Sequence, residues 1–95
     1  MIWQIETQDE QLLLECEVWK ENANLSSNIY FNSKLAKQLS GKDKQIKTLM
    51  NNLNNIEQHI QTLPVDDERY ILYIRDYLNQ QIGQMYQLGL TIRED

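Results

Sequence analysis

Few residues in this chain have the types and spacing that catalysis or metal binding requires. His59 is the only histidine, and the carboxylate close to it in sequence is Glu57. A zinc site needs several closely spaced Cys, His, Asp or Glu ligands, so we expect His59 to be a surface residue or to flank an apolar seam. We therefore predict no metal site and no cofactor.

Three adjacent carboxylates, at Asp66, Asp67 and Glu68, are the next candidates for metal binding or acid/base chemistry. They follow Pro64, which cannot continue a helix, so a new helix is expected to begin here. Asp66 is a good N-cap residue, and negative side chains in a first helical turn interact favourably with the helix dipole. We interpret the three residues as helix-capping.

The remaining reactive groups predict no active site. Cys16 is the only cysteine, so it forms no disulfide within the chain, and a reducing cytoplasm is the expected location. It lies in an apolar stripe with Lys20 as its basic neighbour, which predicts an inert core thiol. Residues 40–42, Ser-Gly-Lys, lack the upstream glycine and the preceding strand of a phosphate loop. Because no nucleophile and base occur together, we predict that the protein is not an enzyme.

The charge is negative and unevenly distributed. A net charge of −5 argues against a nucleic-acid surface, which needs clustered lysine and arginine. However, residues 34–47 hold five lysines against Asp43 alone. This stretch is interpreted as a solvated helix face, with contact to an acidic partner or nucleic acid as the alternative. No run of 18 apolar residues occurs and the start is unlike a secretory signal, so no membrane span is expected.

A heptad-like seam predicts a long helix over residues 28–62. The seam residues alternate in steps of three and four, with Lys42 at the one missing position: Leu35, Leu39, Ile46, Leu49, Leu53, Ile56, Ile60 and Leu63. That spacing places them along one face of an α-helix. Gly41, which follows Ser40, is expected to kink or break the helix, since glycine costs about 1 kcal/mol in a helix interior.

A second helix is predicted over residues 67–88, after the turn at Pro64. Its apolar stripe consists of Ile71, Ile74, Leu78, Ile82 and Met85. Gly89 follows the stripe and is typical of a helix C-terminus. Because only a few residues join the two helices, they should lie antiparallel.

The first third favours a helix over residues 8–23, with a strand as the alternative. Leu12, Cys16, Trp19 and Ala23 have helical spacing, whereas LLLECEVW also alternates in the manner of a strand. We prefer the helix because no convincing partner strand is evident. The predicted fold class is therefore all-α: residues 1–95 form a single domain, a small three-helix up-down-up bundle with a long antiparallel helical hairpin.

Three segments resemble the N-terminal half of the family of primosomal replication protein PriC. They are FNSKL at residues 31–35, NLNNIEQHI at 52–60 and ILYIRDYLNQQI at 71–82, and the likeness spans roughly residues 10–90. The chain departs from the family at Asn32, where Asp is usual, and it ends where the family continues into a basic helical half. The resemblance implies a replication-restart factor whose partners are the replicative helicase DnaB and single-stranded DNA-binding protein.

The function expected on this basis is a non-enzymatic protein-interaction domain that helps to load the helicase at stalled forks, with weak or no direct DNA binding. The alternative is a coiled-coil adaptor, chaperone or phage assembly protein whose seam pairs with another chain. The family motif assigns no functional residue here, so physical criteria alone suggest the partner-binding residues. Exposed aromatic and basic side chains are common at interaction hot spots, and we select Phe31, Lys34, Arg69 and Tyr73.

Overall fold

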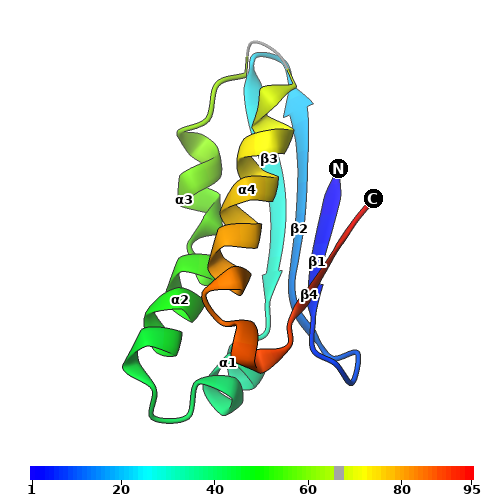
Figure 1. The fold of residues 1–95 in the computed structure, drawn as a ribbon. Coiled ribbons are helices and arrows are strands. Elements are labelled where there is room, and N and C mark those ends of the chain that lie inside the picture. Colours follow the sequence, from blue (N-terminus) through cyan, green and yellow to red (C-terminus); the bar gives the residue numbers. More distant parts are fainter. Residues whose placement is uncertain (66–67) are drawn as a thin grey trace.

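A four-stranded sheet forms one layer of the molecule, and helices cover one of its faces (Figure 1). The computed structural model describes residues 1–65 and 68–95. The strands are β1 (Ile2–Glu6), β2 (Leu12–Glu21), β3 (Asn24–Phe31) and β4 (Thr91–Glu94). Between β3 and β4 lie α1 (Ser33–Ser40), α2 (Lys44–Asn54), α3 (Ile56–Gln61), α4 (Arg69–Gly83) and the 3-10 helix η1 (Tyr86–Leu88). The predicted all-α class, a three-helix up-down-up bundle, is therefore wrong.

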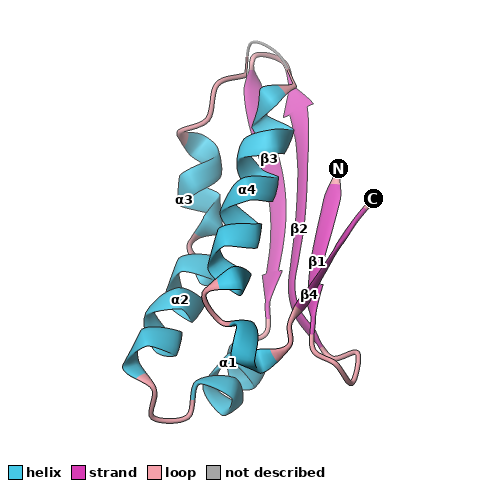
Figure 2. Cartoon of the chain, viewed as in Figure 1, coloured by secondary structure: helices cyan, strands magenta, loops and turns pink. Residues whose placement is uncertain are grey.

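The helix expected over residues 8–23 is wrong because most of that segment is β2, the longest strand. Leu14, Cys16 and Val18 point to one side of it and are fully buried, so the alternating pattern prevails over the helical one. β2 pairs with β1 on one side and with β3 on the other, both antiparallel (Figure 2). These are the partner strands whose apparent absence favoured the helix.

The sheet order is β3-β2-β1-β4, so the two ends of the chain are neighbours. The amide of Ile2 donates to the carbonyl of Asp95 at 3.0 Å, and the amide of Asp95 donates back at 2.9 Å. The register of β1 and β2 shifts by one residue after Ile5, and the extra residue, Leu13, is fully buried. This bulge adds a further apolar side chain to the core.

The long helix expected over residues 28–62 is divided into α1, α2 and α3, and its first residues belong to β3. Gly41 ends α1 with a φ of 55°, so the predicted break is confirmed. Asn55 separates α2 from α3. The seam packs in one core with the sheet and with α4, rather than in a core made of helices alone. Its most buried members, at most 5% exposed, are Leu35, Ile46, Leu49, Leu53, Ile56 and Ile60.

The helix predicted over residues 67–88 is α4 followed by η1, and α4 runs antiparallel to α2 and α3 (Figure 1). Ile74, Leu78 and Met85 from its stripe are fully buried. Gly89 ends η1 in the left-handed conformation, with a φ of 65°. The N-cap predicted at Asp66 lies outside the described residues, as does Asp67. None of the helices in the described ranges is long and apolar enough to cross a membrane.

Candidate protein-docking groove

A groove opens where α1 and α2 meet the end of β3. Its volume is about 600 Å³. The residues that line it are Phe31, Ser33, Ala36, Lys37, Ser40, Gly41, Lys47, Met50, Asn51 and Asn54. We name this feature the α1–α2 groove. It lies within the range of volumes that ligand-binding clefts have.

Two capping residues determine how α1 and α2 meet. The Asn32 side chain accepts a hydrogen bond from the Leu35 amide at 3.0 Å and donates one to the Leu12 carbonyl at 3.2 Å. It therefore caps α1 and ties its start to β2. Asp43 caps α2 by accepting from the amides of Gln45 and Ile46, at 2.9 and 3.2 Å. Between the caps, Gly41 turns the chain, so that α2 folds back against α1.

The floor of the groove is apolar. Ala36 and Met50 are 5% and 3% exposed, and Phe31 at the end of β3 is partly buried. Ser40 is buried as well, but its hydroxyl donates to the Ala36 carbonyl at 2.6 Å and is satisfied within α1. An entering side chain would therefore meet mainly carbon atoms on the floor, which favours an apolar group there.

The rim of the groove is basic. Lys37 of α1 and Lys47 of α2 are exposed, and neither forms an ion pair with any carboxylate in the described parts of the chain. Asp43 is the single acidic residue between positions 32 and 56, and its carboxylate already accepts two backbone amides. The groove therefore presents positive charge on a chain whose net charge is −5.

The structure separates the four residues selected from the sequence into two pairs. Phe31 lines the α1–α2 groove, and Lys34 is exposed on α1 beside it without lining it. Arg69 and Tyr73 lie in the first turns of α4, at the opposite end of the molecule (Figure 1). Tyr73 is 43% exposed. The four residues therefore do not form one surface.

Lys37, Lys47 and Met50 are groove residues that sequence reasoning did not select. Both lysines belong to the basic stretch at residues 34–47, so a signal for them was present. Which lysines face one another depends on how the chain turns at Gly41, and that geometry is not readable from helical spacing.

The residues that could have done chemistry have other roles in the structure. The His59 ring stacks on Tyr77, with ring centroids 4.2 Å apart, and burial lowers the pKa of His59. The Tyr77 hydroxyl donates to the Asn52 carbonyl at 3.0 Å, and burial raises the pKa of Tyr77. Cys16 is fully buried, as predicted for a core thiol, and its burial raises the pKa to about 12. Within the described ranges, no three Cys, His, Asp or Glu side chains are grouped as metal ligands would be.

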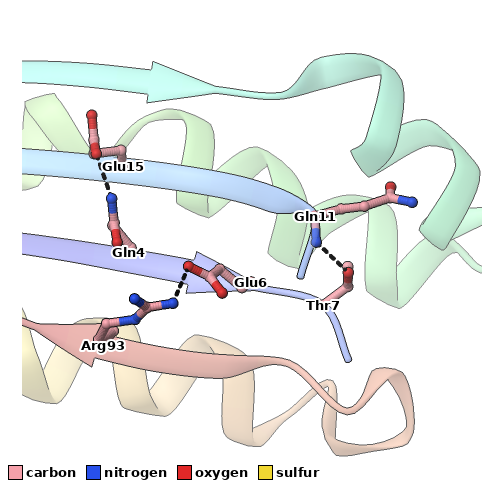
Figure 3. A network of polar contacts seen from close by, with 6 residues as sticks. All are labelled: Gln4, Glu6, Thr7, Gln11, Glu15 and Arg93. Carbon is pink, nitrogen blue, oxygen red and sulfur yellow. Dashed lines mark hydrogen bonds and ion pairs between the residues drawn. The ribbon is translucent and has the colours of Figure 1, made fainter. Parts of the chain in front are cut away.

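The face of the sheet that the helices leave uncovered is polar. Gln4 donates to Glu15 at 2.6 Å, and Arg93 pairs with Glu6 at 2.6 Å (Figure 3). Glu17 lies on the same face of β2, since it alternates with buried residues. Among the charged side chains of this face, Glu6, Glu15 and Glu17 outnumber Arg93, and the groove holds the opposite charge.

The comparisons with known proteins add no relative. The resemblance to the primosomal family spans residues 10–90, and two of the three strands in the first third, β2 and β3, lie within that span. The all-α fold predicted from the apolar spacing is contradicted for that part. Neither a family model, nor a curated protein, nor a solved structure matches this chain.

Proposed function

We propose that this domain is a non-enzymatic docking module that binds an acidic segment of a partner protein in the α1–α2 groove. The observation that carries the proposal is the combination of an apolar floor with a lysine rim on an otherwise acidic chain. In this proposal, one apolar side chain of the segment contacts Phe31 and Met50. Neighbouring carboxylates of the segment lie beside Lys37 and Lys47.

The floor favours a protein segment over nucleic acid. Single-stranded nucleic acids are typically bound by aromatic side chains that stack on successive bases along a basic channel. In the groove, Phe31 is the one aromatic side chain, and it is partly buried. Two lysines offer too few phosphate contacts for strong binding at physiological salt, because non-specific affinity grows with the number of phosphates that are neutralised.

The electrostatic part of binding should act mainly on the association rate. Exposed lysines attract an acidic segment over a Debye length of about 8 Å at physiological ionic strength. The apolar contact on the floor should then determine how long the segment stays bound, since buried anchors carry most of the binding energy.

A charge-reversal pair tests the proposal. The probe is a fluorescent peptide of Asp and Glu residues around one Leu, and its anisotropy is measured against the wild-type domain. Lys37→Glu with Lys47→Glu should weaken binding by at least about tenfold, which corresponds to about 1.4 kcal/mol. Lys42→Glu with Lys44→Glu is the control, because it changes the net charge equally on exposed residues that do not line the groove.

Equal losses from the two variants would contradict the proposal, because they would indicate attraction to the basic stretch as a whole. A single-stranded oligonucleotide that binds more tightly than the peptide, with a steep salt dependence, would favour the nucleic-acid alternative instead. Circular dichroism of each variant verifies that the helices are intact.

The same assay extends to the partners that the primosomal resemblance implies. Purified replicative helicase and single-stranded DNA-binding protein serve as the probes, and the cytoplasm is the proposed location of the encounter. If the wild type binds either protein and the double variant Lys37→Glu with Lys47→Glu does not, a role in replication restart through this groove would be supported. Absence of binding to both would remove that role and leave the docking of other acidic segments as the function.

A further inference from the structure

β3 is the edge strand of the sheet, and one side of its backbone has no partner strand among the residues that the structure describes. The Asn32 amide donates to the Leu13 carbonyl at 2.8 Å, which extends the β2–β3 ladder by one pair. Hydrogen-bonded pairs alternate along an antiparallel ladder, so the even-numbered residues of β3 bond to β2. The odd-numbered residues, Leu25, Ser27, Ile29 and Phe31, direct their amides and carbonyls outward. No hydrogen bond to these outward groups occurs among the described residues.

α3 packs against β3, but the residues of this edge have none of the sequence features that discourage pairing with another strand. Proteins blunt edge strands with charges, proline, bulges or short length. β3 has eight residues, none of them charged or proline, and its register with β2 is unbroken. The opposite edge, β4, has four residues, and Arg93 and Glu94 on it form ion pairs with Glu6 and Arg75. β3 is therefore longer than β4 and uncharged, so it is the better edge for pairing with another strand.

We propose that two copies of this chain associate through β3, antiparallel across a two-fold axis at Asn28, to form one eight-stranded sheet. This register pairs Leu25 with Phe31 of the second copy and Ser27 with Ile29. It engages all four residues whose backbone groups point outward. A shift by two residues would leave at least one of these four without a partner.

A second copy fits this edge better than a charged peptide because the strand is self-complementary. Leu25, Ile29 and Phe31 are partly buried hydrophobic residues on the helix-covered face, so pairing them across the axis extends the core of each copy. On the open face, Tyr30 is 51% exposed and would lie opposite Ser26 of the other copy. A two-fold arrangement makes each of these contacts twice.

The acidic open face does not oppose this association. Glu15 and Glu17 are on β2, and the two β2 strands of the dimer would be separated by three strand spacings, about 14 Å. That distance exceeds the Debye length of about 8 Å at physiological ionic strength, so repulsion between these carboxylates is largely screened. The two β3 strands, which touch, bring no charges together.

Cysteine cross-linking tests the register. Asn28 faces its own copy in a non-hydrogen-bonded pair, where Cα atoms are about 4.5 Å apart and within the range of a disulfide. Asn28→Cys should therefore form a covalent dimer quickly in oxidised glutathione. Ser26→Cys is the matched control, because its two copies would lie about 14 Å apart along the strands. The buried native Cys16 should not react in either variant.

Sedimentation of the unmodified chain and of Ser27→Pro completes the test. Proline at position 27 removes an amide that points away from β2, so the monomer should keep its circular dichroism while the dimer is lost. Supporting results are a wild-type dimer, a monomeric Ser27→Pro and cross-linking of Asn28→Cys alone. A wild-type monomer at all concentrations would overturn the proposal, and so would equal cross-linking of Asn28→Cys and Ser26→Cys. None of these readouts depends on whether the α1–α2 groove binds a peptide.

Discussion

The two faces of the sheet are built from alternate residues of the same strands, yet they have opposite roles. On the covered face, Trp3, Ile5, Cys16 and Val18 are fully buried beneath the helices. On the open face, the neighbouring polar residues bond to one another, as the pairs Gln4–Glu15 and Glu6–Arg93 illustrate (Figure 3). Stability is therefore concentrated on the covered face, and the open face is free to carry charge.

Ile5 and Gln4 provide the sharpest test of this difference, because they are adjacent on β1 and point to opposite faces. Ile5→Ala should lower the free energy of unfolding by about 2–5 kcal/mol, since it leaves a cavity in a fully buried site. Gln4→Ala removes one hydrogen bond on the open face and should cost about 1 kcal/mol or less. Urea unfolding measures both changes. Losses of similar size would mean that the open face contributes as much stability as the core.

The helical half of the fold was predictable because its signal is local. The seam from Leu35 to Ile60 repeats every three or four residues if Lys42 is counted, and the structure buries its apolar members except Leu39, which is partly buried. What it packs against was not predictable, because an apolar stripe is equally well covered by a helix or by a sheet. The expected bundle supplied only helices for that role, whereas in the structure α1 also packs against β2 and α3 against β3.

The sheet could not be predicted from local sequence patterns, as β2 and β3 illustrate. LLLECEVW fits a strand and a helix almost equally well, so the decision depends on pairing with distant segments. β3 has the sequence NLSSNIYF, which is half polar and by itself predicts a connecting loop. Its strand conformation becomes evident only from its pairing with β2. β4 is separated from its partner β1 by more than eighty residues. Pairing over such distances leaves no local pattern.

The candidate site was predicted in part. The basic stretch at residues 34–47 and Phe31 were singled out, and both contribute to the α1–α2 groove. Lys37 and Lys47 face the same groove because Gly41 turns the chain between them. A continuous helix would have placed them about 15 Å apart along its axis, too far to flank one small cleft.

Cys16 allows the covered face to be tested by pH. Burial raises its pKa from 9.0 to about 12, so the folded state holds the thiol proton more tightly than the unfolded state. This contribution to stability is complete below pH 9.0 and is lost as the pH rises towards about 12. One pH unit above 9.0 the loss should be about 1.4 kcal/mol.

The measurement is the free energy of unfolding at alkaline pH, in the wild type and in Cys16→Ala. The variant should begin less stable but should decline less as the pH rises, because tyrosine and lysine titrate in both proteins. Parallel declines would show that the thiol is not shielded by the core.

Removing the ion pairs of β4 should change the stability least. One pair lies on each face of the sheet, so the two faces can be compared within one strand. Glu94 accepts from Arg75 of α4 at 2.7 Å, and this hydrogen bond lowers the pKa of Glu94. Its contribution is therefore present above the ordinary pKa of 4.5 and is lost as the pH falls through the lower folded value. Glu94→Gln should remove that part of the acid sensitivity at a cost smaller than that of Ile5→Ala, because the pair is partly exposed.

Glu6→Gln is the matched change on the open face, where the partner Arg93 is 63% exposed. It should cost less than Glu94→Gln, because the pair of Glu94 joins the sheet to α4 whereas that of Glu6 joins two strands already bonded through their backbones. Urea unfolding of the wild type and both variants at neutral and acidic pH compares the two pairs. A larger loss from Glu6→Gln would mean that the open face holds β4 in place, and the division of roles between the two faces would then fail at this edge of the sheet.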